Sequence, residues 1–211
     1  MSVTMYAQKD VTKFLGIPVD GTKTEMMNKL KAKGFVPSSY DSNILEGEFN
    51  GFDVNVYVVT NNNKVYRIMV CDKNTLDETS IKIKFNNLCR QFEKNSKYVS
   101  FEDYKIPESE SISYEMLVNK KRYDAAFYQL PQSYDTVAIK NDIQPMLLEK
   151  YSEEELANPT EEIQADIVSM TLSYMATLLE KKTVWFTISE FKGGYYLSIY
   201  YENNYNRADD I

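Results

Sequence analysis

The sequence predicts an α+β protein in which tandem units, each a helix plus an antiparallel sheet, follow one another along the chain. Two Thr-x-x-Glu capping boxes each precede a stretch whose apolar residues recur at helical spacing. Alternating apolar and polar segments, separated by turn residues, come after each stretch and are typical of antiparallel strands. We therefore expect helices packed on one sheet face, plus one long inserted helix near the C-terminus.

The first predicted helix begins at the capping box Thr22–Glu25, in which each of the two end residues can bond the backbone N–H of the other. Gly34 stands where a helix needs a left-handed residue in order to end, and Phe35 follows in a position to pack on Leu30. Because these residues have structural roles, we interpret residues 14–35 as helix architecture rather than as a binding motif.

Three strands are predicted between Ile44 and Cys71. Asn50-Gly51 favours a type I′ hairpin turn, and pairing about this turn places Glu48 opposite Asp53. A three-residue loop, Asn61-Asn62-Asn63, is expected to return the chain into the third strand. The alternation then leaves one apolar face across all three strands.

The second predicted helix begins at the capping box Thr75–Glu78 and ends at Asn95. Its apolar stripe consists of Ile81, Phe85, Leu88, Cys89 and Phe92. Cys89 is accordingly expected to be a small buried hydrophobic residue. A disulfide between Cys89 and Cys71 stays open, because it needs an oxidising compartment and close Cα atoms.

The rest of the chain carries shorter signals. A Gly193-Gly194 turn is expected to close a final hairpin that puts Ile188 opposite Ile199 and Phe186 opposite Tyr201. Thr160 is the predicted cap of the longest helix. In chain order, the expected elements are a strand at 98–101, a hairpin of 111–118 with 123–130, a strand at 137–139, short and long helices at 153–156 and 160–182, and a hairpin of 184–191 with 195–202.

These elements divide the chain into four parts. Residues 9–72 form a first helix-plus-three-strand unit, and residues 73–202 form a second helix-plus-sheet unit that contains the inserted helix 160–182. Residues 203–211 are expected to be a mobile tail. Residues 1–8 are expected to be a signal-peptide remnant or a disordered tail.

Composition excludes several functions. The formal net charge is −7 and no basic stripe is present, so nucleic-acid binding is not expected. No apolar run reaches the roughly 20 residues that span a bilayer. The chain contains no histidine and only two cysteines, so it cannot form histidine-based catalytic sites or a four-ligand zinc site from these residues. No cofactor, metal or nucleophile motif is found, and we expect no enzyme activity.

The N-terminal segment Ser2–Gln8 is mildly apolar and ends in a small residue followed by a polar one. This pattern is similar to the last third of a secretory signal peptide, which favours a periplasmic or exported protein. The alternative is an ordinary tail on a cytoplasmic protein.

KAKGF at the end of the first helix, followed by a meander with an Asn50-Gly51 hairpin, resembles the tandem units of the beta-lactamase-inhibitory-protein-like fold. FLGIPVDG followed by a capped helix is also similar to a family of small exported proteins of unknown function from gut anaerobes. The likeness covers residues 14–71 and extends loosely into the second half. It implies export and binding of another protein through an open sheet face. The chain departs from the related small lipoproteins by lacking a lipid-bearing cysteine and by adding the long helix.

The outward face of the last hairpin is the main candidate interaction surface. Trp185, Phe191, Tyr196 and Tyr200 are expected to stand exposed there on adjacent strands. Tyrosine and tryptophan dominate binding hot spots because they give rigid contact area at low entropic cost. The alternative is that another element covers this face.

An acidic strand face is the second candidate site. Glu46, Glu48 and Asp53 share this face, and like charges directly opposite one another cost stability. A hard cation, a raised pKa or the nearby Arg67 can relieve that cost. Two carboxylates are also the minimum for a glycoside hydrolase. The plain alternative is a solvated strand face.

Three hypotheses follow. The first is a non-enzymatic exported protein that binds a protein or cell-envelope component through the aromatic sheet face. The second is a carboxylate-based glycan hydrolase that uses Glu46, Glu48 or Asp53. The third is an intracellular immunity-type inhibitor. The partner and the oligomeric state are not given by the sequence.

Overall fold

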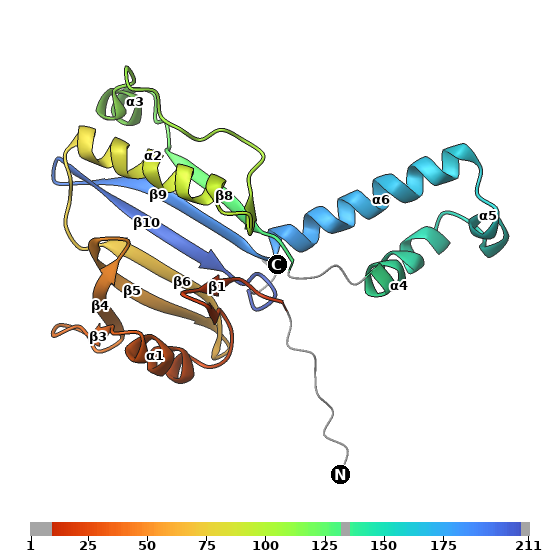
Figure 1. Cartoon of the computed structure of the whole chain (residues 1–211), viewed down its shortest axis with the longest axis horizontal. Coiled ribbons are helices and arrows are strands. Elements are labelled where there is room, and N and C mark those ends of the chain that lie inside the picture. The colour runs from red at the N-terminus through yellow and green to blue at the C-terminus, as the bar shows by residue number, and fades with distance from the viewer. Residues whose placement is uncertain (1–9, 132–135, 208–211) are drawn as a thin grey trace, which may run out of the picture. The chain divides into compact units, whose positions relative to one another are not determined.

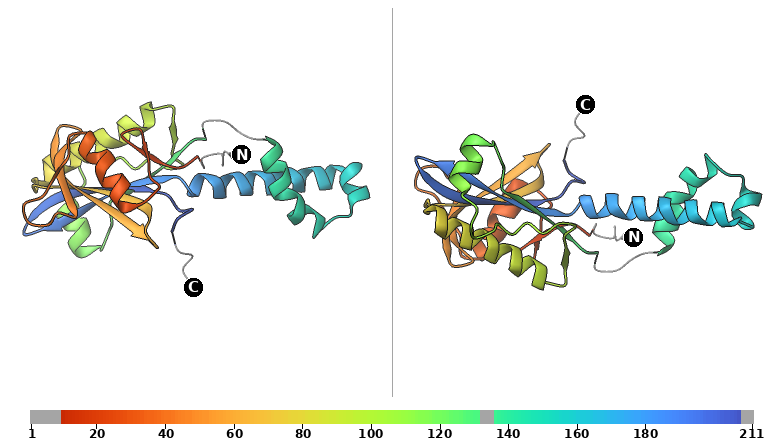
Figure 2. Two further views of the ribbon diagram at one scale, coloured as in Figure 1. Left: turned by 90° about the horizontal axis from the view of Figure 1, so that it is seen from below. Right: turned by 90° about the horizontal axis from the view of Figure 1, so that it is seen from above.

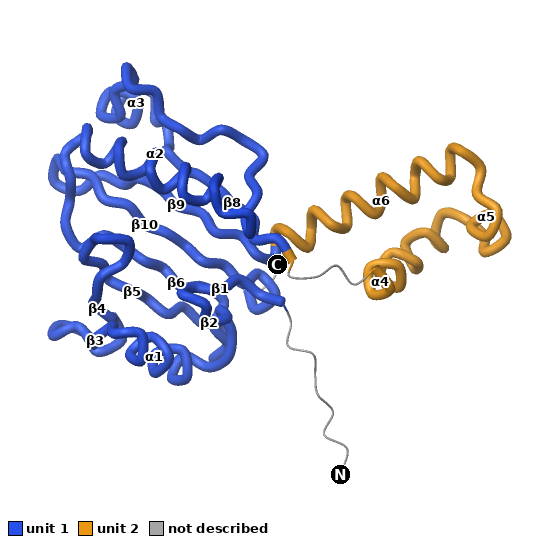
Figure 3. The backbone as a smooth tube through the Cα atoms, viewed as in Figure 1, with its two compact units in different colours: residues 1–130, 181–211 blue, residues 131–180 orange. Residues whose placement is uncertain are grey.

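The computed structural model describes residues 10–131 and 136–207 of the chain. The chain divides into two compact units, which are described separately (Figure 3). The sheet unit consists of residues 1–130 and 181–211, and the helical unit consists of residues 131–180. Helices and an antiparallel sheet are both present, so the predicted α+β class is confirmed.

The sheet unit is built on an eight-stranded antiparallel sheet with the order β3-β4-β5-β6-β10-β9-β8-β7 within the described residues (Figure 1). Strands β1 and β2 pair with each other in a separate two-stranded sheet. The strands are β1 (Lys13–Phe14), β2 (Ile17–Pro18), β3 (Val36–Pro37), β4 (Ile44–Phe49), β5 (Phe52–Asn61), β6 (Lys64–Asp72), β7 (Tyr98–Val99), β8 (Asp124–Gln129), β9 (Thr183–Phe191) and β10 (Gly194–Glu202).

The sheet has two halves with the same order of elements. Helix α1 (Lys23–Ala32) precedes β3 to β6, and helix α2 (Glu78–Lys94) precedes β7 to β10. Each half runs from the sheet edge to the centre, where β6 pairs with β10. The two segments predicted as helix-plus-sheet units thus contribute to one continuous sheet. The second half carries two insertions, the short helix α3 (Ile112–Val118) and the helical unit.

Helix α1 forms as its local signals predict. The Thr22 side chain accepts from the Glu25 N–H, and the Glu25 carboxylate accepts from the Thr22 N–H at 2.9 Å. At the other end, Gly34 has a φ of 101°, and the Phe35 N–H donates to the Leu30 carbonyl at 3.3 Å. These bonds make a Schellman stop, in which the left-handed position favours glycine.

Helices α1 and α2 pack on the same face of the sheet (Figure 1). The predicted stripe of α2 is buried, and its Phe85 ring meets Phe186 of β9 with centroids 5.1 Å apart. Phe92 stacks on Phe127 of β8 at 4.8 Å. One hydrophobic core therefore joins both helices to every long strand.

The pairing of β4 with β5 is as predicted, with Glu48 opposite Asp53. The predicted three-residue loop after β5 is wrong. Asn62 and Asn63, with φ values of 47° and 60°, form a two-residue turn, and the register then shifts between Val59 and Thr60. The primed two-residue turn matches the twist of the strands, and a bulge absorbs the extra residue.

The last hairpin has a corrected register. Lys192 and Gly193 form its turn, with φ values of 52° and 79°, so Ile188 faces Leu197 and Phe186 faces Ile199. The Gly193-Gly194 turn was therefore misplaced by one residue. Gly194 lies in β10, where a Cβ would come within 2.7 Å of the Thr75 Cβ. The shift is two residues along the pairing, so each side chain stays on its predicted sheet face.

The cap of α2 also differs from the prediction. Asp77, not Thr75, is the N-cap, and its carboxylate accepts from the Ser80 N–H at 2.9 Å. Leu76 instead forms a backbone bridge with Tyr195. The predicted stop at Asn95 is confirmed.

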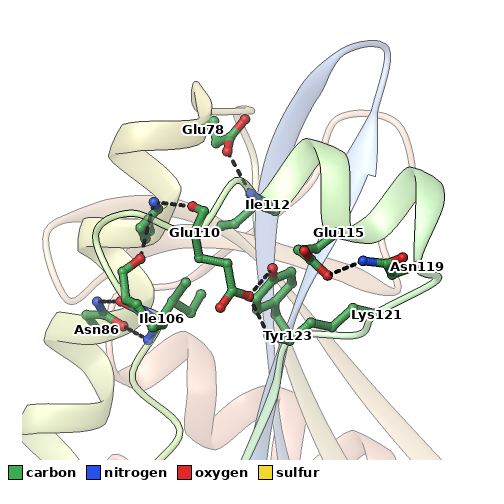
Figure 4. A network of polar contacts seen from close by, with 11 residues as sticks. Glu78, Asn86, Ile106, Glu110, Ile112, Glu115, Asn119, Lys121 and Tyr123 are labelled. Atoms are coloured by element: carbon green, nitrogen blue, oxygen red, sulfur yellow. Dashed lines mark hydrogen bonds and ion pairs between the residues drawn. The ribbon is translucent and has the colours of Figure 1, made fainter.

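Residues 111–118 were predicted as a strand but form α3. The Glu78 carboxylate accepts from the Ile112 N–H at 2.6 Å (Figure 4). It also accepts from the Ser113 hydroxyl at 2.7 Å. This carboxylate, from a distant helix, satisfies an N–H that the first turn of α3 leaves unpaired. The Ser111 side chain accepts from the Tyr114 N–H. The local alternation of small and apolar residues was thus overridden by a contact made across the fold.

The segment before α3 is tied to α2 by side chains (Figure 4). Asn86 donates to the Ile106 carbonyl and accepts from the Ile106 N–H, both at 2.8 Å. Glu110 accepts from the Tyr123 hydroxyl at 2.5 Å. These bonds fix an otherwise irregular stretch on the sheet unit.

The helical unit contains α4 (Thr136–Leu148), α5 (Glu153–Ala157) and α6 (Glu161–Glu180), arranged with α4 beside α6 (Figure 2). The predicted strand at 137–139 is wrong, because these residues belong to α4. The helix predicted at 153–156 and the long helix capped by Thr160 are confirmed. Among the described residues, no helix combines the length and apolar character needed to cross a lipid bilayer.

The residues that directly follow β10 are bonded to the rest of the sheet unit. Asn203 is buried, and its amide donates to the Val19 carbonyl at 2.7 Å. Asn206 donates to Asp20 and to the Val65 carbonyl. The tail predicted to be mobile therefore begins with hydrogen-bonded residues. Residues 1–8, predicted as a signal-peptide remnant or a disordered tail, and residues 208–211 lie outside the described residues.

Both cysteines are free thiols. Cys89 belongs to α2 and its side chain is buried, as predicted. Cys71 pairs in register with Ser198 on the opposite face of the sheet, and its sulfur lies 3.4 Å from the serine hydroxyl. The sheet thus separates the two thiols, and the open question of a disulfide is answered against one.

Candidate functional site

Alternation along the strands leaves one face of the sheet opposite to α1 and α2, and we call it the open face. Phe186 and Ile199 face the core, so their neighbours Trp185 and Tyr200 lie on the open face. The central residues of the open face are Tyr57, Arg67, Met69, Cys71, Trp185, Thr187, Ser189, Tyr196, Ser198, Tyr200 and Glu202.

Trp185 and Tyr200 form the centre of this surface. They are directly opposite in the register, and their rings stack with centroids 3.9 Å apart and planes 8° apart. Both side chains are half-buried. Stacking restricts their rotamers, so the aromatic surface is rigid before any partner arrives.

A buried ion pair supports this stack. Glu202 is 3% exposed, and its Oε1 accepts from Arg67 Nε at 2.8 Å and from Trp185 Nε1 at 2.9 Å. The Arg67 guanidinium also lies 5.2 Å from the centroid of the Tyr200 ring. The second Glu202 oxygen, Oε2, is buried without a hydrogen-bond partner in the described part of the chain.

Beside the stack lies a pocket with a volume of ≈ 350 Å³. Its walls are mostly aromatic, sulfur-containing or hydroxyl side chains. Burial raises the pKa of Tyr57, Cys71 and Tyr200, which keeps these groups neutral near pH 7. The lining includes Tyr57, Met69, Cys71, Phe191, Tyr196, Ser198 and Tyr200.

The four predicted aromatic residues therefore share the open face, though not with equal exposure. Phe191 is 57% exposed, whereas Tyr196, Tyr200 and Trp185 are half-buried. Tyr196 lies opposite Ser189 and two residues before Ser198 on the same face, and it lines the pocket together with both serines. Three of the aromatic side chains are therefore packed into the surface, and the Phe191 side chain extends from it.

On the acidic strand face, the charge of Glu46 is paired with a lysine. Lys73 Nζ lies 2.6 Å from Glu46 Oε2, and hydrogen bonds from Lys73 and then Ser38 lower the pKa of Glu46. Arg67, the cation named in the sequence analysis, pairs with Glu202 instead. A glycoside hydrolase needs one acid with a raised pKa, and the pKa of Glu46 moves in the other direction.

Glu48 and Asp53 face each other at the end of the β4–β5 hairpin and are exposed. Within the described residues, no group of three or more Cys, Asp or Glu side chains is placed to hold a metal ion. The arrangement fits charges that extend into solvent at a hairpin end.

A larger hollow of ≈ 470 Å³ lies on the other side of the sheet unit, between α2 and the β4–β5 turn. Asn87 and Gln91, which are exposed polar side chains, line it together with Lys84. The hollow has no set of convergent, buried polar groups, so we place the candidate site on the open face.

Sequence reasoning did not connect Tyr57, Met69 and Arg67 with the aromatic surface, and it gave Glu202 no role there. The first three lie on strands β5 and β6, which join the last hairpin through the β6–β10 pairing. That pairing connects residues more than a hundred positions apart. The alternation of β5 and β6 did place these side chains on the outer face, but no local signal said which strand would lie beside it.

Comparison with known proteins adds no identity. No family model matches the chain, and no curated protein or solved structure matches it with statistical significance.

Proposed function

We propose that this chain is a non-enzymatic, exported protein that binds a protein or a cell-envelope component through the open face. One observation carries the proposal: Trp185, Phe191, Tyr196 and Tyr200 gather on the sheet face opposite to the helices, beside a pocket of ≈ 350 Å³. Contiguous aromatic surface of this kind is uncommon unless something binds to it.

The chemistry of the face supports recognition rather than catalysis. Its centre is aromatic, and its cations Arg67 and Lys73 are each paired with a carboxylate. Rigid aromatic rings surrounded by polar groups are typical of binding hot spots. The expected partner presents an apolar or aromatic group that fills the pocket and a polar rim around it.

The proposal of export rests on the composition of Ser2–Gln8. Fractionation of the source cells with an antibody to the chain tests it. We expect the chain in the envelope or outside the cell. Recovery with the cytoplasmic proteins would favour an intracellular inhibitor instead.

Binding is tested by capturing partners from a cell-envelope extract. Phe191→Ala/Tyr196→Ala removes two rings from the open face, neither of which takes part in the Trp185–Tyr200 stack. The matched control, Ile83→Ala/Tyr114→Ala, removes two exposed apolar side chains from α2 and α3. Circular dichroism should first show that both variants are folded.

We expect the wild type and the control to capture the same component, and the open-face variant to lose it. Equal capture by both variants would place binding on another surface. Absence of any captured component, in envelope and soluble extracts alike, would argue against a recognition module.

A further inference from the structure

Helix α6 has one side that packs on α4. Ile163 is buried there together with Ile143 and Leu147 of α4. The Tyr174 hydroxyl donates to Asp142 at 2.5 Å, which ties the two helices together further along.

A second apolar seam runs along a different side of the same helix. Its residues are spaced three and four apart in turn, which is the spacing of a coiled-coil seam. Val168 is 58% exposed and Leu172 is 61% exposed. The residues of this seam are Ala165, Val168, Leu172, Met175 and Leu179.

The seam carries no charge along most of its length. Residues 167–179 contain no Asp, Glu, Lys or Arg, although much of this stretch is exposed. Ser169 and Ala176, beside the seam, are small and allow another helix to approach closely. A helix that is apolar on two sides is normally buried on both.

Charge in the helical unit is instead concentrated at one end. Residues 136–180 contain nine acidic residues and two lysines, a formal charge of −7. Seven of the acidic residues fall between Glu149 and Asp166, the stretch that includes α5 and the start of α6 (Figure 2). Two copies that paired with their helices parallel would bring these acidic ends together.

Antiparallel pairing avoids that repulsion. A helix of 20 residues, the length of α6, is about 30 Å long, and charges in solution are screened within about 8 Å at physiological salt. The acidic ends of two antiparallel copies would therefore be electrostatically independent. The uncharged seam is the same surface on both copies, as a two-fold interface requires.

We propose that α6 of one copy pairs antiparallel with α6 of a second copy along this seam. Val168 then packs on the second copy's Leu172, and Ala165 packs on its Met175. With α4 on the far side of each α6, the paired helical units form a four-helix assembly. This surface is separate from the open face, so the two proposals stand or fall independently.

The first test measures the mass of the full chain by analytical ultracentrifugation. We expect a dimer that dissociates on dilution. Leu172→Glu puts a charge at the centre of the seam and should leave a monomer at concentrations where the wild type is dimeric. Thr177→Glu adds the same charge at an exposed position off the seam and should stay dimeric. Circular dichroism checks that both variants keep their helix content.

The second test reads the orientation with introduced cysteines and a short thiol cross-linker. A mixture of Ala165→Cys and Met175→Cys chains should cross-link, whereas neither variant alone should do so above the level of the unsubstituted chain. Linkage of Ala165→Cys with itself would mean parallel pairing and would overturn the proposal. A wild type that is monomeric, or a dimer that Leu172→Glu leaves intact, would also overturn it.

Discussion

At the scale of single residues, Glu202 connects the ion pair of the open face to its aromatic stack. A carboxylate that is 3% exposed tolerates its loss of water only because Arg67 and Trp185 donate to it. The same bonds orient the Trp185 ring against Tyr200. The rigidity of the candidate binding surface thus depends on a charge pair rather than on apolar packing alone.

Arg67→Ala tests that dependence. It leaves the Glu202 carboxylate buried without its cation, so we expect a loss of about 3–5 kcal/mol in the free energy of unfolding. Lys105→Ala breaks an exposed pair with Glu93 and should cost far less, because exposed ion pairs contribute little to stability. Urea unfolding followed by Trp185 fluorescence measures both, because Trp185 is the chain's single tryptophan. Equal losses would mean that Glu202 is relieved in another way.

The two thiols give a second prediction at this scale. Burial raises the pKa of Cys71, and it raises the pKa of Cys89 to about 12. Since the thiolate is the reactive form, both should react slowly at pH 8 with an aromatic disulfide reagent, and Cys71 should react before Cys89. Mass spectrometry of partly labelled protein identifies the order. Faster labelling of Cys89 would show that α2 opens away from the sheet.

At the scale of elements, local signals predicted helix α1 and the β4–β5 hairpin, whose bonds are local. The cap at Thr22 and the stop at Gly34 depend on bonds to residues of the same helix. Residues 111–118 were predicted wrongly because their helix depends, besides its Ser111 cap, on Glu78, which is more than thirty residues away. The turn of the last hairpin was misplaced because Gly194 allows the close approach of the Thr75 side chain and does not form part of the turn. The predicted sheet face of each side chain in β9 and β10 was nevertheless right, since alternation is a property of the strand itself.

The cap of α3 can be tested through its carboxylate. Hydrogen bonds, first from the Ser113 hydroxyl, lower the pKa of Glu78 below its usual 4.5. A lowered pKa stabilises the fold above the pKa of the unfolded group, and this stabilisation is lost as the pH falls through the folded value. Glu78→Gln should therefore speed amide hydrogen exchange in residues 112–118 at pH 7.

Acidification of the wild type below pH 4.5 should have the same effect, after correction for the intrinsic rate of exchange. Glu115→Gln, which changes a carboxylate within α3 itself, is the matched control and should change exchange less. Unchanged protection in Glu78→Gln would show that apolar packing of Ile112 holds the helix without its cap.

At the scale of the whole molecule, the sheet unit is continuous across the point where the helical unit is inserted. Strands β8 and β9 pair with each other, and the Gln129 N–H donates to the Lys182 carbonyl at 3.0 Å. The chain thus leaves and re-enters the sheet at neighbouring positions. The helical unit occupies the place of a hairpin loop, which long insertions can do at low cost in stability.

Replacing residues 131–180 by a short Asn-Gly turn tests this organisation. We expect the sheet unit to fold, with a free energy of unfolding no lower than that of the full chain, because closing a much shorter loop costs less entropy. The shortened chain should also be monomeric and should still capture the partner of the open face. Loss of cooperative unfolding would mean that the helical unit is part of the core.

The most direct test of the central claim is a titration of the full chain with its captured partner, followed by Trp185 fluorescence. The single tryptophan lies in the stack at the centre of the open face, so it reports on that surface and on no other. We predict a saturable change in Trp185 emission and a reduced access of iodide to the ring. A partner that binds, by ultracentrifugation, while Trp185 emission and iodide access stay unchanged would contradict the assignment of binding to the open face.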